Sequence, residues 1–126
     1  FNLKGDPCTK IDLETLCRSV GITRVRDVDP YNLKECDDAV KEELAADEPS
    51  VIISRRPCAL LKYVKHNGPI TANADKCVGC KSCMKIGCPA ISIVDGKVKI
   101  DATLCTGCGV CSQLCKLGAL PNGKES

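Results

Sequence analysis

The first 61 residues alternate between helix-like and strand-like patterns of apolar positions. Residues 9–12, Thr-Lys-Ile-Asp, have the form of a capping box in which Thr9 would begin a helix. The apolar positions that follow share one helical face and stop at Gly21: Leu13, Leu16, Cys17 and Val20. A second helix is predicted to begin after Asn32, with an apolar face formed by Leu33, Cys36, Val40 and Leu44.

Two strands are predicted to alternate with these helices. Residues 22–28 are a weak strand candidate that ends at Asp29-Pro30, and residues 50–54 are a short apolar run typical of a strand covered on both faces. This alternation predicts an α/β sheet. Two strands and two helices cannot bury their own apolar surface, so we expect the truncated, parallel-sheet end of a larger α/β domain. The start at Phe1, with Met84 as the only methionine, favours the same interpretation.

A hairpin is predicted in the second half of the chain. Two alternating segments within residues 91–100 flank Asp95-Gly96, a dipeptide that favours a type I′ turn. The apolar side chains on this hairpin are expected to cover the cysteine-containing loops on either side of it: Ile93, Val98 and Ile100.

The cysteines change the picture, because there are 12 of them in 126 residues and eight lie between positions 77 and 115. We call Cys77, Cys80 and Cys83 the first run, and Cys105, Cys108 and Cys111 the second run. Each run has the spacing C-x2-C-x2-C, and each is followed by a fourth cysteine, Cys88 or Cys115. The two runs are 28 positions apart, with Gly79 matching Gly107, so the segment is an internal duplication.

This spacing matches the bacterial two-cluster ferredoxin pattern, in which three cysteines hold one 4Fe–4S cluster and the fourth reaches the other. A tight loop can place three thiolates on three corners of a cubane, but it cannot also fold back to the fourth corner. Two ligand sets are therefore predicted. Set I consists of Cys77, Cys80, Cys83 and Cys115, and set II consists of Cys105, Cys108, Cys111 and Cys88.

Cysteines also serve in proteins as disulfides, zinc ligands and small buried hydrophobic residues. Disulfides need an oxidising compartment, and no export signal is visible. Zinc is a serious alternative, although its cysteine pairs are usually separated by a dozen or more residues. Cys17 and Cys36 lie on apolar stripes and are interpreted as small buried hydrophobic residues. Cys8 and Cys58 have no ligand-like neighbour, and the role of Cys58 is left open.

The net charge of +2 is too small to indicate nucleic-acid binding, and no run of eighteen apolar residues indicates a membrane span. A cytoplasmic protein is expected. The charge is unevenly distributed: residues 1–49 carry net −5, whereas residues 50–126 carry net +7. Such a basic surface would suit an acidic protein partner. The basic residues 55, 56, 62 and 65 by themselves are more typical of a solvated face.

The chain resembles the large, alpha subunit of indolepyruvate ferredoxin oxidoreductase. The resemblance rests on Gly5-Asp6-Pro7, on residues 28–61 with their segment SVIISRRPCALL, and on KCVGCKSCMKIGCPAIS at 76–92. The first run has four residues before Cys88 rather than the three of ferredoxins, and this spacing is similar to that of the family. Lys116 stands where a proline would usually follow the fourth cysteine.

The resemblance implies α+β architecture and three segments. Residues 1–61 would end a thiamine-diphosphate-binding α/β domain, residues 62–73 would be a linker, and residues 74–126 would be the bacterial-type two-cluster ferredoxin-like domain. The family oxidatively decarboxylates aryl pyruvates to acyl-CoA with thiamine diphosphate and Mg²⁺, and it reduces ferredoxin. Its diphosphate motif, Gly-Asp-Gly followed by an Asn pair, is absent from this sequence, so this chain alone is expected to be inactive.

The partners implied are the rest of the large subunit, a small beta subunit and an acidic external ferredoxin. No nucleic acid and no membrane are expected as partners. The alternative is a free-standing two-cluster electron carrier with an unrelated N-terminal extension. Free carriers of this kind are usually acidic, whereas residues 50–126 are basic.

Overall fold

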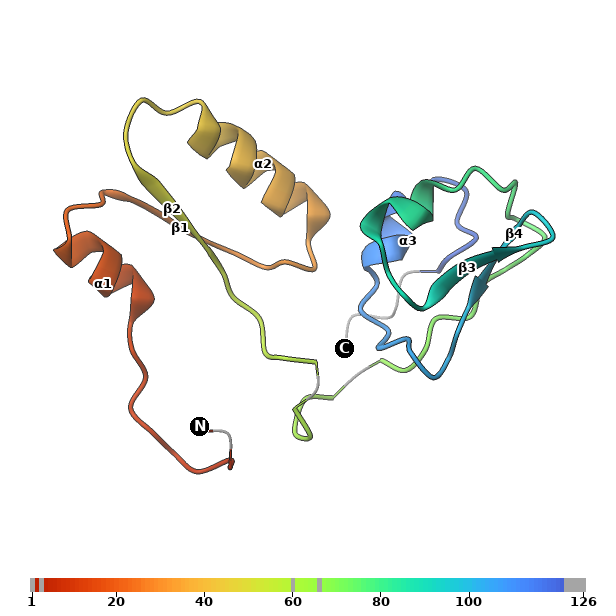
Figure 1. Ribbon diagram of the computed structural model, residues 1–126, viewed down its shortest axis with the longest axis horizontal. Coiled ribbons are helices and arrows are strands. Elements are labelled where there is room, and N and C mark those ends of the chain that lie inside the picture. Colours follow the sequence, from red (N-terminus) through yellow and green to blue (C-terminus); the bar gives the residue numbers. More distant parts are fainter. Residues whose placement is uncertain (1, 3, 60, 66, 122–126) are drawn as a thin grey trace. The chain divides into compact units, whose positions relative to one another are not determined.

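The computed structural model describes the chain except for residues 1, 3, 60, 66 and 122–126. The fold is a small α+β arrangement that divides into two compact units, Phe1–Arg56 and Pro57–Ser126. Unit 1 contains α1 (Leu13–Ser19), β1 (Arg24–Val28), α2 (Leu33–Leu44) and β2 (Ser50–Ser54). Unit 2 contains the 3-10 helix η1 (Ser82–Ile86), β3 (Ile91–Val94), β4 (Lys97–Ile100) and α3 (Val110–Leu114) (Figure 1).

Unit 1 is built on a pair of parallel strands. β1 and β2 pair from Arg24↔Ser50 to Val28↔Ser54, and α2 makes the connection between them. Parallel neighbours require such a crossover because the chain must return to the same end of the sheet before the second strand begins. The two helices and two strands predicted from the sequence are therefore present in the predicted order.

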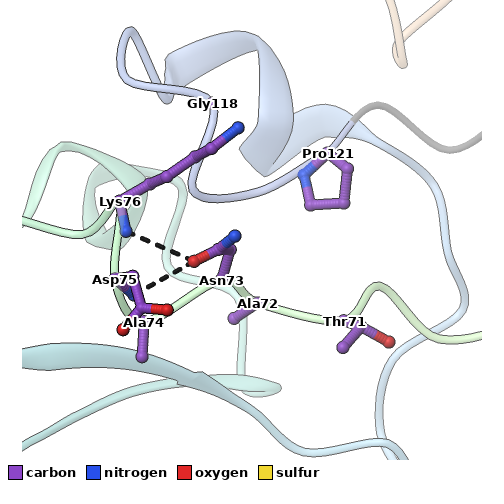
Figure 2. Close-up of a pocket in the computed structure, with 8 residues that line it drawn as sticks. All are labelled: Thr71, Ala72, Asn73, Ala74, Asp75, Lys76, Gly118 and Pro121. Atoms are coloured by element: carbon purple, nitrogen blue, oxygen red, sulfur yellow. Dashed lines mark hydrogen bonds between the residues drawn. The ribbon is translucent and has the colours of Figure 1, made fainter.

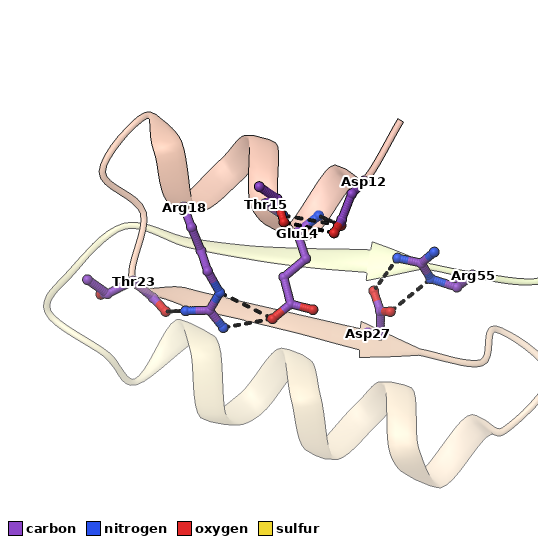
Figure 3. Close-up of polar contacts among 7 residues, drawn as sticks. All are labelled: Asp12, Glu14, Thr15, Arg18, Thr23, Asp27 and Arg55. Atoms are coloured by element: carbon purple, nitrogen blue, oxygen red, sulfur yellow. Dashed lines mark hydrogen bonds and ion pairs between the residues drawn. The ribbon is translucent and has the colours of Figure 1, made fainter. Parts of the chain in front are cut away.

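The start of α1 differs from the prediction. The N-cap is Asp12 and not Thr9, since the Asp12 carboxylate accepts hydrogen bonds from the backbone N–H groups of Glu14 and Thr15 at 3.1 and 3.2 Å (Figure 3). An aspartate directly before the first helical turn satisfies donors that a residue three positions earlier cannot reach. The predicted cap of α2 is confirmed, because the side chain of Asn32 accepts from the backbone N–H of Glu35 at 3.2 Å.

The apolar stripes of unit 1 are largely exposed. Among the described residues of unit 1, the buried hydrophobic ones are Val28, Ala39 and Ile53, whereas Val20 is 70% exposed and Leu44 is 81% exposed. Cys17 and Cys36, which we expected to be buried, are only half-buried. The reason is that the described part of unit 1 offers no second layer against which these faces can pack.

Arginine side chains of unit 1 form ion pairs within α1 and between the ends of the two strands. Arg18 binds Glu14 at 2.8 Å and donates to the carbonyl of Thr23, and Arg55 binds Asp27 at 2.8 Å (Figure 3). Arg56 pairs with Asp29, and its guanidinium lies over the Tyr31 ring, 4.1 Å from the centroid. The two arginines of the sequence RRPC therefore bind the strand end rather than standing free in solvent.

Unit 2 is centred on the predicted hairpin. β3 and β4 pair antiparallel from Ile91↔Ile100 to Val94↔Lys97, and Asp95 and Gly96 have φ values of 49° and 73°. Positive φ at both central positions is what a type I′ turn requires, so this prediction is confirmed. Val98 is buried, and Ile93 and Ile100 pack against the same core as the cysteines.

The segment before the first cysteine run is part of this core. Ile70 is 7% exposed and belongs to the same buried cluster as Cys77, Cys83 and Leu120. The backbone N–H of Asn73 also donates to the carbonyl of Ala119 at 2.8 Å. Residues within the segment 62–73, predicted to be a linker, thus contribute to the packing of unit 2.

Candidate metal centre

The thiols of set I surround a single cavity in unit 2. The lining includes all four members of the set, together with the apolar side chains of Ile93, Val98 and Leu120. Cys77 and Cys83 reach the cavity from the core, and Cys115 comes from the end of α3, more than thirty positions along the chain. The fold therefore brings the fourth cysteine of the second half to the first run.

The thiols of set II are grouped in the corresponding way. Burial raises the pKa of the Cys111 thiol to about 11, and the neighbouring thiols of Cys108, Cys105 and Cys88 add to this increase. Burial likewise raises the pKa of Cys83, with further contributions from Cys115, Cys77 and Cys80. In each set, the electrostatic neighbours of the buried cysteine are the other three members of that set.

Backbone N–H groups point at the sulfurs in positions related by the duplication. Val98 donates to Cys77 Sγ at 3.3 Å, and Ile70 donates to Cys105 Sγ at 3.4 Å. Val98 stands 28 positions after Ile70, and Cys105 stands 28 positions after Cys77, so the two hydrogen bonds join equivalent positions of the duplication. Ala119 also donates to Cys115 Sγ at 3.2 Å. Such donors stabilise thiolate ligands and the negative charge of an iron–sulfur cluster.

Gly79 and Gly107 occupy equivalent sites of close backbone contact. Both have φ of 71°, and a Cβ atom on Gly79 would lie 2.5 Å from the carbonyl oxygen of Gly96. A Cβ atom on Gly107 would lie 2.0 Å from the carbonyl oxygen of Gly68. Each cysteine loop therefore packs against a glycine that lies 17 positions away in sequence for Gly79 and 39 positions away for Gly107, and neither site has room for a side chain.

A turn stabilised by an asparagine or aspartate side chain precedes each cysteine run. Asn73 Oδ1 accepts from the backbone N–H groups of Asp75 and Lys76 at 3.0 and 3.3 Å, beside an open hollow of about 510 Å³ (Figure 2). Asp101, at the equivalent position of the second half, accepts from Thr103 N at 2.8 Å. These turns begin four residues before Cys77 and Cys105 and fix the direction in which each loop starts.

The donor set suits a cubane better than a single ion. Within the described residues, no three His, Cys, Asp or Glu side chains lie close enough together to bind one metal ion. A zinc ion holds its four sulfurs about 2.3 Å from one centre, whereas a cubane places each thiolate on a different iron atom and so spreads them apart. Four cysteines around one apolar cavity fit a 4Fe–4S cluster.

The remaining cysteines lie outside these two groups. Cys8 and Cys58 are exposed, and Cys36 donates its S–H to the carbonyl of Asp29 at 3.3 Å. The sequence interpretation missed the part that Ile70, Gly68 and Gly96 play around the cysteine loops. For Gly68 and Ile70 a signal existed, because they stand 28 positions before Gly96 and Val98 in the duplication.

Residues 69–116 match the family model described as a 4Fe-4S dicluster domain. This match supports two 4Fe–4S clusters as the cofactors of this part of the chain. The matched residues include both cysteine runs and the two fourth cysteines, Cys88 and Cys115.

The whole chain is also similar to one kind of oxidoreductase subunit. It is 36% identical to indolepyruvate oxidoreductase subunit IorA of Methanothermobacter thermautotrophicus over 95% of this chain, and 38% identical to IorA of Pyrococcus horikoshii over 94%. The resemblance seen in the sequence is therefore confirmed. The chain spans about a fifth, 20%, of the length of these relatives.

A third relative matches a shorter stretch of the chain. Pyruvate synthase subunit PorD of Methanothermobacter marburgensis is 35% identical over 51 residues, which are 40% of this chain and 60% of that protein. No solved structure matches the chain. None of the helices in the described ranges is long and apolar enough to cross a membrane.

Proposed function

We propose that this chain transfers electrons through two 4Fe–4S clusters as the C-terminal portion of an indolepyruvate ferredoxin oxidoreductase large subunit. One observation carries the proposal: four thiols from two distant segments surround one apolar cavity in a domain that matches a dicluster model. When bound, the clusters supply one-electron chemistry at low potential. The chain supplies the thiolates, the N–H donors and the apolar cover that excludes water.

The ligands we propose are those of sets I and II. Support comes from the cavity shared by Cys77, Cys80, Cys83 and Cys115, and from the electrostatic grouping of Cys111 with Cys88, Cys105 and Cys108. In this arrangement the two halves exchange their fourth ligand, so neither cluster site is complete without the other half of the duplication.

In the longer protein, unit 1 would be the end of a thiamine-diphosphate-binding α/β domain. The parallel β1–β2 pair and the exposed apolar faces of Val20 and Leu44 support this, since both are expected where further strands and helices pack. This α/β domain would end at about residue 61. The burial of Ile70 and a family match that begins at residue 69 favour an earlier start of the cluster domain than residue 74.

Substrate oxidation would require parts that lie outside this chain. Thiamine diphosphate stabilises the carbanion formed on decarboxylation of a 2-oxo acid, and thiolates cannot replace it. The diphosphate motif is absent from the sequence. We therefore propose that the chain alone does not oxidise indolepyruvate, and that its partners are the rest of the subunit, a small beta subunit and an acidic ferredoxin.

The test is anaerobic reconstitution followed by metal and sulfide analysis. About eight iron and eight acid-labile sulfide per chain are expected from two clusters of four. Zinc at one or two per chain without sulfide would refute the proposal. The same sample is then assayed for ferredoxin- and CoA-dependent oxidation of indolepyruvate, and turnover by this chain alone would contradict the proposal that it is only the electron-transfer portion.

A further inference from the structure

We propose that the cluster of set I has the higher reduction potential, and that electrons leave the domain from it to a small acidic iron–sulfur protein. The inference rests on the proposed function, because it requires both clusters. The duplication makes the comparison direct. Each cysteine of set I has an equivalent in set II, at a shift of 28 positions within the runs and of 27 positions for Cys88 and Cys115, so their surroundings can be compared position by position.

Charge is the first difference. Within two residues of the set I cysteines there are one acidic residue, Asp75, and four exposed lysines: Lys76, Lys81, Lys85 and Lys116. This is a net charge of +3, whereas the same windows around the set II cysteines contain no charged residue. Lys81 lines the cavity of set I itself, and Lys97 Nζ donates to the carbonyl of Cys77 at 2.5 Å.

This difference sets the order of the potentials. A 4Fe–4S cluster with four thiolates is an anion, and reduction adds one more negative charge. Nearby ammonium groups stabilise the reduced form more than the oxidised form, and so raise the potential. The N–H group of Ala119, which donates to Cys115, acts in the same direction, whereas the donor from Val98 to Cys77 is matched by the donor from Ile70 to Cys105. An electron that enters at set II therefore moves downhill to set I.

Exposure is the second difference. At the second cysteine of each run Cys80 is exposed and Cys108 is half-buried, whereas at the first Cys77 is buried and Cys105 is half-buried, so the exposure of set I is concentrated at Cys80. Beside set I, Val78 is 70% exposed and Leu117 is 49% exposed, and both line the set I cavity together with Lys81. Apolar side chains with a charged rim are typical of a protein-binding surface.

The positions equivalent to this surface are different in the second half. Thr106 replaces Val78, and the position of Leu117 is taken by Ala90, which is 3% exposed. Met84 is 40% exposed, whereas its equivalent, Ser112, is buried and donates to the carbonyl of Pro121 at 2.8 Å. An apolar surface formed by Val78, Met84 and Leu117 and bordered by lysines is therefore present beside set I and has no counterpart at the equivalent positions beside set II. Its positive charge suits an acidic partner.

The transfer itself makes and breaks no bond. One electron passes from the reduced set II cluster to the oxidised set I cluster, and then to the oxidised centre of the acceptor. The donor centre loses one electron at each step and the receiving centre gains it, with no proton moved. A basic rim around the exit raises the encounter rate with an acidic acceptor, and salt weakens this effect.

The first test exchanges residues between equivalent positions. Lys76 and Leu104 each lie directly before the first cysteine of a run, and both are exposed. In redox titrations monitored by electron paramagnetic resonance, Lys76→Leu should lower only the higher potential, and Leu104→Lys should raise only the lower one. We expect a three- to tenfold change in the one-electron equilibrium, tenfold being about 59 mV. Any other pattern, including equal movement of both potentials, overturns the proposal.

The second test measures docking with an acidic rubredoxin as the probe acceptor. The triple variant Lys81→Gln, Lys85→Gln, Lys116→Gln should slow its reduction at least tenfold at low salt. The control variant removes three lysines from unit 1, by Lys4→Gln, Lys10→Gln and Lys34→Gln, and should leave the rate within twofold. Equal slowing by both variants, or none by the first, overturns the exit surface.

Iron and sulfide are measured on every variant before these assays. Failure to form two clusters in the unmodified chain would reject the proposed function. Two intact clusters with the reverse order of potentials would reject this inference alone.

Discussion

The contact of Gly107 with Gly68 gives a quantitative prediction for Gly107→Ala. The backbone at Gly107 has φ of 71°, and an alanine Cβ would lie 2.0 Å from the carbonyl oxygen of Gly68. The left-handed conformation costs a residue with a Cβ about 1–2 kcal/mol. Relief of the overlap requires the loop to move away from a backbone atom, and such overpacking typically costs about 1–3 kcal/mol more.

Gly118 supplies the matched control. It also has positive φ, 65°, but its Cβ would meet nothing within 4 Å. Gly118→Ala should therefore cost only the conformational part, about 1–2 kcal/mol. The difference between the two variants is then about 1–3 kcal/mol, which corresponds to a factor of about 5 to 150. Because the Gly68 turn and the second run pack together at this contact, the loss should appear in retention of the clusters.

The assay is anaerobic release of the clusters in excess chelator, followed by the loss of their visible absorbance at one temperature. Gly107→Ala should release iron at least fivefold faster than Gly118→Ala, and Gly79→Ala should behave like Gly107→Ala because it meets the carbonyl of Gly96 at 2.5 Å. Equal release rates for Gly107→Ala and Gly118→Ala would refute the reasoning, since they would show that the close approach has no energetic effect.

Three further predictions concern the cysteines and unit 1. Cys115→Ala should damage the cluster of the first run and Cys88→Ala that of the second, and spectra in which each change affects its own run would exclude the exchange of ligands. Cys17→Ala and Cys36→Ala should leave iron content unchanged and cost about 1 kcal/mol of stability, measured by denaturant unfolding. The pKa of Glu43 is lowered by its hydrogen bond from an arginine of β1, so its contribution is complete above about pH 4.5 and is lost as pH falls through the lowered value. The difference between the unfolding midpoints of the unmodified chain and Glu43→Gln, measured by circular dichroism, should therefore be constant well above about pH 4.5 and shrink as the pH falls below it, and a difference that does not change with pH would contradict this.

The chemistry of the cluster domain could be predicted from sequence because it depends on local spacing. Three thiolates two residues apart and a duplication at 28 positions are visible without coordinates, and so is the Asp95-Gly96 turn, whose φ values follow from the residues themselves. The helices and parallel strands of unit 1 were also predicted, since helical and strand periodicities are local. The N-cap was misassigned to Thr9 because two capping residues, Thr9 and Asp12, stand three positions apart.

Tertiary structure decided what lies far apart in the sequence. The exchange of Cys115 was expected from the cysteine spacing, but only the folded chain shows that Ile70 is buried in one core with Cys77 and Cys83, and that Gly107 closely approaches Gly68. Apolar spacing predicts a face but not what covers it, and for this reason the stripes that include Val20 and Leu44 are exposed rather than buried. Burial and close approach depend on contacts between distant segments, and no local pattern encodes them.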